Sequence, residues 1–448
     1  MSGGLMQIIA VGAQDLFLTG TPEITFFRSH HKQYTAFAVE SVAQTFNGQV
    51  GWNKRVSSTI SRNGDLINNM WLEINLTWSG EAGDDECWYP AEACLREVEL
   101  EIGGQRIDRH TNDFFRVYDE LYRNEQQKRA YKRMTNFSSE DMLGSTVTVT
   151  NNNSSAPKKL DITRRFYVPL LFWFCRDTSL SLPLIALQFH EVKLYFTFAD
   201  ARATITPGND QPPLVAEDSA LQATLFVDYI FLDAAERKNF ASSNAELLIT
   251  QLQYTTETIE PFQVGNGLSS TKNVRLSFNH PCSTLIWFVK GEKHGWYNVS
   301  RAIATVPDKN PTTADSLYND MYAPVASAKL SINGHERSQA RPGQFYSQVQ
   351  PYQTLGARPQ AGIYMYSFAL DSSKVTQPNG TLNFSRVDNC TLSIDFKGMS
   401  DMAVPNDISS PDIMVNEGRY KLRTLVVMAV NWNVLRLVSG MAGLAFSN

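Results

Sequence analysis

The feature that most constrains the fold is a pattern that occurs twice, with the copies roughly 200 residues apart. Tyr167–Phe198 contains an apolar segment, a Ser- and Pro-containing connection and an alternating segment, and Ile363–Phe396 repeats this order. Upstream of each copy lies a second match, between Val98–Arg106 (VELEIGGQR) and Ala328–Arg337 (AKLSINGHER). Repeat units of solenoid proteins are about 20–50 residues long, so this spacing indicates a duplicated domain. We therefore expect two similar domains in tandem.

Alternation of apolar and polar residues identifies these domains as β-structure. Apolar residues occupy every second position in Val192–Phe198 and in Leu392–Phe396, as in strands with one buried face. Tyr167–Cys175 is almost continuously apolar and is expected to be a fully buried strand. About eight such segments occur in each half, joined by loops of unequal length. The pattern predicts an all-β fold of two tandem eight-stranded jelly rolls.

Breaks in the strand pattern predict the domain boundaries. We expect an N-terminal arm at 1–26, a first jelly roll at 27–232, a linker with a short helix at 233–245 and a second jelly roll at 246–448. Aromatic residues across Phe26–Phe46 predict an entry strand into the first sheet. Apolar residues at helical spacing in Asn112–Met134 predict one or two helices inserted in a loop of the first domain.

Composition excludes several classes of protein. Of 448 residues, 43% are hydrophobic and 19% charged, which is typical of an ordered globular chain. A net charge of −5 argues against a protein that coats a nucleic-acid backbone. No signal peptide is evident, and the apolar run that contains Pro169 is far shorter than the ~20 residues of a membrane helix. We expect a soluble protein.

The five cysteines have no spacing that indicates a metal site. No CxxC motif occurs, and the number is odd, so Cys175 and Cys390 are interpreted as small buried residues inside strands. Unpaired cysteines favour folding in a reducing, cytosolic compartment. His190 and Glu191 lack the second histidine of the HExxH zinc motif, because position 194 is leucine.

One carboxylate cluster has the spacing of a possible catalytic site. Glu97, Glu99 and Glu101 share a strand face, and alternate positions lie about 7 Å apart, within the range of glycosidase pairs. Alternation with apolar residues favours a solvated face instead. No nucleophile elbow, P-loop or dinucleotide motif is present, so we expect no catalytic, cofactor or metal site. Eight Asn-x-Ser/Thr sequons occur, and those in loops, Asn152, Asn153 and Asn298, are the candidates for glycosylation.

Several motifs, in order along nearly the whole chain, resemble one known family. They are Gly12–Phe27 (GAQDLFLTGTPEITFF), Ser61–Asp65 (SRNGD), Glu97–Asp108 (EVELEIGGQRID), Arg165–Pro169 (RFYVP), Leu182–Phe196, Val227–Leu232 (VDYIFL), Phe278–Pro281 (FNHP) and Asn433–Leu444. They resemble the major capsid proteins of large nucleocytoplasmic double-stranded DNA viruses, above all those of algal viruses. Departures from the family pattern fall in expected loops, at 80–88, 143–161, 291–320 and 397–417.

The resemblance implies a double jelly roll that acts as a structural shell protein. In this family three chains form a capsomer with a pseudo-sixfold outline, which contacts neighbouring capsomers and tiles the facets of an icosahedral capsid. It implies minor capsid proteins beneath the shell, contacted by the N-terminal arm, and an inner viral membrane nearby that the chain does not span. No direct contact with nucleic acid is implied, and outer loops would meet the host surface. The expected location is the virion, after assembly in the host cytoplasm.

Two alternatives remain open at this point. A glycan-binding or glycan-cleaving double β-sandwich would need exposed aromatic residues beside paired carboxylates. Trp88, Trp296 and Tyr297 are the loop aromatics that could provide such a platform, although packing within loops explains them more simply. A bacterial surface or adhesion protein is the second alternative, and the lack of a signal peptide argues against it.

Overall fold

The computed structural model describes residues 2–29, 31–81, 85–86, 90–135, 146–149, 159–206, 220–242, 245–259, 271–291, 324–357, 359, 362–397 and 422–446. The chain forms two compact units, Met1–Phe37 and Ala38–Asn448. The first unit contains helices α1 (Gly3–Ile9) and α2 (Leu16–Thr19). None of the residues in these two helices is buried.

The first strand begins later than the sequence suggested. An entry strand was expected across Phe26–Phe46, but β1 spans only Phe37–Gln44. The described residues between 27 and 36 form neither helix nor strand. The aromatic residues of this stretch, such as Phe27 and Tyr34, are exposed rather than packed in a sheet. The arm predicted at 1–26 therefore lies within a longer unit that ends at Phe37.

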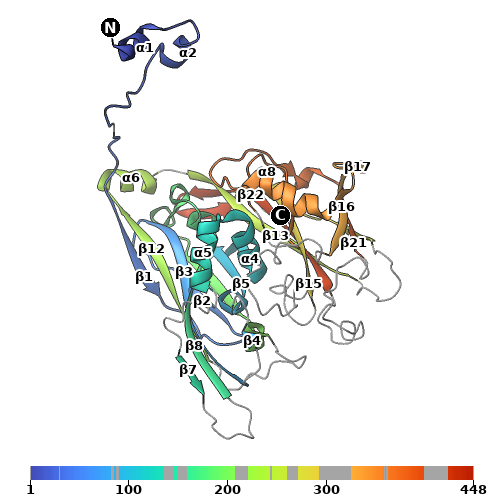
Figure 1. Ribbon diagram of the computed structural model, residues 1–448. Helices are drawn as coiled ribbons and strands as arrows, with labels where there is room; N and C mark the ends of the chain where they lie inside the picture. The colour runs from blue at the N-terminus through green and yellow to red at the C-terminus, as the bar shows by residue number, and fades with distance from the viewer. Residues whose placement is uncertain are drawn as a thin grey trace. The chain divides into compact units, whose positions relative to one another are not determined.

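Two antiparallel sheets form the first jelly roll (Figure 1). One has the order β1-β12-β3-β8-β7, and the short β9 also pairs with β3. The other has the order β2-β10-β5-β6. The bounds are β2 (Arg55–Thr59), β3 (Leu66–Glu81), β5 (Leu95–Ile102), β6 (Gln105–Thr111), β7 (Thr146–Val149), β8 (Lys159–Pro169), β9 (Leu182–Pro183), β10 (Val192–Phe198) and β12 (Ala220–Leu232). A separate ribbon joins β4 (Asp85–Glu86) to β11 (Ile205–Thr206).

The second jelly roll has two sheets of the same kind. One has the order β13-β22-β15-β19, with β20 on β15 and β23 on β22, and the other has the order β14-β21-β16-β17, with β18 on β16. The bounds are β13 (Ala245–Thr258), β14 (Thr271–Arg275), β15 (Pro281–Gly291), β16 (Val325–Ile332), β17 (His335–Glu336), β18 (Arg341–Pro342), β19 (Tyr364–Ser367), β20 (Leu382–Asn383), β21 (Cys390–Phe396), β22 (Leu422–Val438) and β23 (Met441–Leu444).

The two halves have one topology. If the eight principal strands of each half are numbered along the chain, both halves have the sheet orders 1-8-3-6 and 2-7-4-5. This arrangement is the jelly roll, so the predicted fold of two tandem jelly rolls is confirmed. Even the short strands agree, because β9 and β20 each precede a 3₁₀ turn, η3 (Leu184–Ala186) and η9 (Phe384–Arg386).

The repeated segments found in the sequence, Val98–Arg106 and Ala328–Arg337, have the same geometry in both halves, since each forms a hairpin, β5–β6 or β16–β17. Leu100 pairs with Leu194 between β5 and β10, and Leu330 pairs with Leu392 between β16 and β21. Both hairpin turns place two residues at positive φ: Gly103 and Gly104 at 59° and 83°, and Asn333 and Gly334 at 50° and 81°. Glycine and asparagine tolerate these angles, which two-residue hairpin turns require.

The alternation in β10 and β21 predicts their buried faces correctly, since both strands alternate buried and half-buried residues throughout. The prediction for Tyr167–Cys175 is wrong in its second half, because β8 ends at Pro169 and Cys175 lies in the 3₁₀ helix η1 (Trp173–Cys175). Proline lacks the N–H that would continue the ladder. The apolar residues that follow, including Phe172 and Phe174, are buried without forming a strand.

Short helices occupy the connections. The stretch expected to hold one or two helices forms α4 (Asn112–Tyr122) and α5 (Glu125–Thr135), and the linker contains α6 (Ala234–Ser242). The remaining helices are α3 (Pro90–Ala93), η2 (Thr178–Leu180), η4 (Ala201–Thr204), the π-helix η8 (Phe345–Val349) and α8 (Gln350–Leu355). In Figure 1, α4 and α5 lie between the sheets of the first and second jelly rolls.

Two apolar clusters form the interior of the larger unit. One cluster lies between the two sheets of the second jelly roll and includes Trp287, Val427 and Ile394. The other fills the first jelly roll and continues onto the outer face of β15 and β22, where it includes Phe288 and Met428. The second jelly roll therefore buries both faces of one sheet, and the first jelly roll covers the outer one.

Candidate functional site

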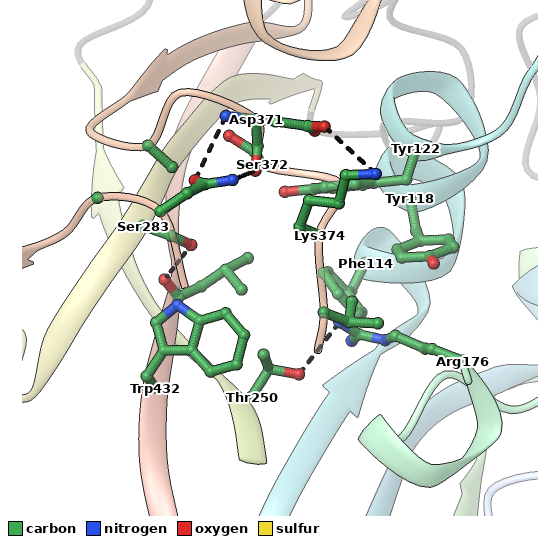
Figure 2. Close-up of a pocket in the computed structure, with 15 residues that line it drawn as sticks. Phe114, Tyr118, Tyr122, Arg176, Thr250, Ser283, Asp371, Ser372, Lys374 and Trp432 are labelled. Atoms are coloured by element: carbon green, nitrogen blue, oxygen red, sulfur yellow. Dashed lines mark hydrogen bonds and ion pairs between the residues drawn. The ribbon is translucent and has the colours of Figure 1, made fainter. Parts of the chain in front are cut away.

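Helix α4 forms the centre of the junction between the jelly rolls. It begins after Thr111, whose backbone is extended, and places an acidic residue in the first turn, where the helix dipole favours it. Phe114, Tyr118 and Tyr122 recur at helical spacing and share one side of the helix. Figure 2 shows these three rings on one side of a cavity and residues of the second jelly roll, such as Trp432, on the other.

A buried ion pair crosses this junction. Lys290 of β15 pairs with Asp113 in the first turn of α4, and the Asp113 side chain is only 6% exposed. Burial raises the pKa of Asp113, and the Lys290 ammonium opposes that shift. Removal of both charges from water is costly, so the pair is stabilising only while each partner has the other.

Further polar contacts connect the same two surfaces. The backbone N–H of Leu252 donates to Asp108 Oδ1 at 3.0 Å, and Arg176 donates to Thr250 Oγ1 at 3.3 Å. The Arg109 guanidinium lies 4.7 Å from the centre of the Tyr254 ring, within the range of a cation–π contact. Together these contacts hold β6 and η1 of the first jelly roll against β13 of the second.

A buried histidine and aspartate lie beside α4. His110 Nε2 is 2.9 Å from Asp108 Oδ2, and both side chains are almost completely buried. The imidazole stacks on Phe172, with ring centres 4.8 Å apart, and contacts Phe114 at the same separation. A substrate has no access to this pair, so its chemistry is that of a packed polar contact rather than of a catalytic dyad.

Helices α3, α4 and α5 enclose a cluster of charged side chains. Arg116 pairs with Asp119 at 3.3 Å and also with Glu120, and all three side chains are almost fully buried. Lys128 is also buried in this cluster, and its Nζ lies 3.7 Å from Glu120. Burial raises the pKa of Glu92 to about 7, against the opposing charge of Arg116.

The glutamates of β5 do not form the solvated face that the sequence predicted. Glu99 is 8% exposed and pairs with Arg55 of β2 and with Arg106 of β6, the latter at 3.4 Å. Glu97 and Glu101 are half-buried. Long arginine side chains from the neighbouring strands cover this face, because their aliphatic stems lie along the sheet while the charged ends reach the carboxylates.

The cavity of Figure 2 is small. It has a volume of about 20 Å³, room for about one water, and is lined by both jelly rolls. Lys374 and Asp371 form an ion pair at its rim, 3.9 Å apart. A sugar ring cannot enter a space of this size, so the cavity does not provide the cleft that a glycan-binding protein would need.

Several residues selected from the sequence lie outside the described residues. These are the glycosylation candidates Asn152, Asn153 and Asn298 and the loop aromatics Trp88, Trp296 and Tyr297. In the described part of the chain, no three His, Cys, Asp or Glu side chains are grouped so as to hold a metal ion. Nor does any helix found there have the length and apolar character needed to cross a membrane.

The described cysteines are free thiols. Cys94, Cys282 and Cys390 are buried, and Cys175 is half-buried in η1. Burial raises the pKa of Cys175 to about 12 and that of Cys390 to about 11. A thiol with such a pKa is almost entirely protonated at neutral pH, so Cys175 and Cys390 are unreactive packing groups.

Sequence reasoning did not find the junction residues Asp113, Arg176 and Lys290. Each is an ordinary charged residue near an apolar segment, and nothing local indicates its partner. The duplication offered one signal. Arg176 and Leu370 both precede an Asp-x-Ser sequence, in which Asp177 and Asp371 accept a hydrogen bond from the backbone two residues on. A position that is charged in one copy and apolar in the other indicates different surroundings.

Comparison with known proteins identifies relatives over the whole chain. Residues 25–233 match the family model described as major capsid protein N-terminus, and residues 236–443 match the model described as large eukaryotic DNA virus major capsid protein. The two matches divide within the linker region that contains α6.

Individual relatives agree with the family models. The major capsid protein of Paramecium bursaria Chlorella virus 1 is 43% identical over 465 residues, and that of Pyramimonas orientalis virus is 37% identical over 473 residues. Both matches cover 100% of this chain and of the relative. In the quasi-atomic model of the PBCV-1 virus capsid, the matching chain is 40% identical with a TM-score of 0.78, covering 95% of this chain and 100% of that one.

Proposed function

The chain belongs to the family of large eukaryotic DNA virus major capsid proteins, and from this premise we propose that three copies associate into a capsomer with a six-sided outline. As a major capsid protein it is a component of the virion and forms an icosahedral capsid; it is not an enzyme. The alternative of a glycan-binding or glycan-cleaving protein is not supported.

The single observation that carries the trimer is the repeated sheet order. Each chain supplies two jelly rolls of one topology, so three chains supply six similar units. Closed cyclic symmetry relates the three chains, and the duplication relates the two halves of each. The resulting ring has six similar edges and meets six neighbours, which suits a flat hexagonal array on a capsid facet.

The N-terminal arm is proposed to contact minor capsid proteins beneath the shell. Its apolar side chains, among them Ile8, Phe17 and Phe26, are strongly exposed, and such residues usually mark an interaction site. An inner viral membrane would lie nearby, and the acidic chain would not contact nucleic acid directly. Outer loops would meet the host surface and carry any glycans at Asn152, Asn153 or Asn298. Assembly would take place in the host cytoplasm.

The solution mass of the full-length chain tests the trimer. Light scattering should give three times the chain mass of 50.3 kDa, and negative-stain images of the same peak should show six lobes. A peak of 50.3 kDa at micromolar concentration would contradict the proposal.

A truncation tests the role of the arm. Deletion of residues 1–20 should leave the trimer intact, since the arm is assigned to contacts below the shell. The same deletion should reduce the yield of closed shells when the trimer is assembled together with the other virion proteins. A truncated chain that stays monomeric would show that the arm is needed for association of the three copies instead.

A further inference from the structure

We infer that the junction between the two jelly rolls of one chain is repeated between chains, with the η8–α8 side of one copy against the outer face of β3 and β12 of the next. The inference rests on the proposed trimer and names the surfaces that form it. It follows from the duplication, because the contact is formed once within the chain, while the corresponding residues of the second version are partly or largely exposed in the described part of the chain.

The contact between the two jelly rolls of one chain is fully formed. Ile286 and Phe288 of β15 and Val426 and Met428 of β22 point away from the core of their own jelly roll, yet all four are buried. Phe114 and Phe115 of α4 belong to the same apolar cluster as these four residues, and Asp113 of α4 pairs with Lys290 of β15. The sheet that contains β15 and β22 therefore buries its outer face only by contact with the first jelly roll.

Strand pairing gives the corresponding residues of the first jelly roll. Ile67 of β3 pairs with Leu182 of β9, as Cys282 of β15 pairs with Leu382 of β20. Counting on from Ile67 and Cys282 gives the counterparts Trp71 and Ile286, Glu73 and Phe288, and Asn75 and Lys290. The adjoining strands agree, since Trp71 pairs with Phe226 and Ile286 pairs with Met428.

The same reasoning identifies the covering helix. His110 of β6 pairs with Val98, and Arg341 of β18 pairs with Ala328, so His110 and Arg341 correspond. Three residues further on lie Asp113 in one half and Gln344 in the other. An aromatic pair follows each of them, Phe114–Phe115 before the rest of α4 and Phe345–Tyr346 at the start of η8.

In the described part of a single chain, the counterpart residues on both surfaces are partly or largely exposed. Val349 and Tyr352, which share one side of the η8–α8 segment, are 40% and 76% exposed. The rings of Trp71 and Phe226 stack with centres 6.4 Å apart and are half-buried. Figure 1 shows β12 on the left of the two-jelly-roll unit and α8 on the second jelly roll to its right, so the two surfaces do not meet within one chain. A second copy can bring them together, by a head-to-tail contact.

The chemistry of the two versions differs. Glu73 and Thr224 lie where the second jelly roll has Phe288 and Val426, and Asn75 and Gln344 replace the Lys290–Asp113 ion pair by two neutral amides. Glu73 and Thr224 therefore make the middle of the contact between chains more polar than its counterpart, while the two amides leave its edge without charges. Interfaces between separately folded units are typically more polar than permanent ones.

Cross-linking of the full-length chain tests the assignment. The double variant Asn75→Cys/Gln344→Cys is treated with a short bis-maleimide and separated on a denaturing gel. We expect covalent dimers and trimers. Each single variant should remain a single chain, because a head-to-tail contact brings position 75 of one copy to position 344 of another. Co-expression of the two single variants should give covalent dimers and no trimers. The wild-type chain controls for its own cysteines.

The outcomes separate this inference from the proposed trimer. A wild-type particle of three chains whose double variant gives only single chains would overturn the assigned surfaces and leave the trimer standing. Cross-linked dimers of either single variant would indicate a symmetric contact and would also overturn it. A wild-type chain that is monomeric by light scattering would instead contradict the trimer itself. Thermal unfolding of each variant shows whether it is folded.

Discussion

Asp113 in the first turn of α4 and Lys290 on β15 form an ion pair that connects the two jelly rolls. The two residues come from opposite halves of the chain, and the carboxylate is the more deeply buried partner. Their contact ties the covering helix to the edge of the face that it covers. Stability of the junction should therefore depend on both charges.

Lys290→Ala should lower the free energy of unfolding by about 2 kcal/mol at pH 7, because it leaves a buried carboxylate without its partner. Burial already raises the pKa of Asp113, and loss of the ammonium raises it further. The deficit should shrink as the pH falls, since a protonated Asp113 needs no cation. Urea unfolding at several pH values measures this.

An exposed pair provides the control for that variant. Lys329 and Glu336 lie 3.0 Å apart with both side chains exposed. Lys329→Ala should change stability by less than about 1 kcal/mol, as is usual for a surface ion pair. A Lys290→Ala deficit that does not vary with pH would contradict the role given to Asp113.

Glu92→Gln should stabilise the protein at high pH and have little effect at low pH. The pKa of Glu92 is raised from 4.5 to about 7 by burial, so the folded state favours the protonated carboxyl. The stabilisation that this proton provides is complete below about pH 4.5 and is lost as the pH rises through about 7. Glutamine stays neutral throughout, so the variant should gain about 2 kcal/mol over wild type by pH 8.

Glu125→Gln is the matched control for Glu92, because Glu125 is an exposed member of the same group of helices. Its effect on stability should be small at every pH. Thermal unfolding of both variants and wild type between pH 5 and 8 gives the comparison. Equal pH dependence of Glu92→Gln and wild type would show that Glu92 does not titrate in this range.

Glu99→Gln should cost about 1 to 2 kcal/mol of stability, whereas Glu101→Gln should cost less than about 0.5. Glu99 is buried and shared by Arg55 and Arg106, while Glu101 only accepts a hydrogen bond from Tyr195, 3.5 Å long. Chemical denaturation of the two variants measures the difference. Equal effects would mean that the arginines do not distinguish the two carboxylates.

Gly103→Ala should be more destabilising than Gly104→Ala, at about 2 against about 1 kcal/mol. Both glycines have positive φ, so each variant carries the strain of that backbone conformation. A Cβ at position 103 would in addition overlap the ring of His190, whereas one at position 104 would meet nothing. His190 Nδ1 lies 3.0 Å from the carbonyl oxygen of Ala442, so its displacement should also loosen the junction. Thermal unfolding tests the order.

The sequence predicts the duplicated jelly rolls because their pattern is local. Apolar and polar residues alternate throughout the seven residues Val192–Phe198. The glycine and asparagine residues of the two hairpins indicate their turns by residue type alone. The helices α4 and α5 were predicted for the same reason, since helical spacing is visible within a few turns.

The predictions that failed concern what covers a surface. Periodicity shows that Glu99 lies opposite the core, but not that Arg55 from another strand closes over it. An apolar run such as Leu170–Phe174 reveals burial without revealing whether the backbone is a strand. The pairing of Asp113 with Lys290 depends on how two folded halves meet, which no local pattern contains.

The junction that Asp113 and Lys290 close within each chain has a consequence for assembly. In the proposed trimer, three of the six junctions form as each chain folds, when their surfaces share one polypeptide and a high effective concentration. The other three must wait for separate chains to collide. The amount of closed ring at equilibrium then depends on the third power of the chain concentration, whereas six separate jelly rolls would give a dependence on the sixth power. Capsomers can therefore form at a much lower concentration of newly made protein.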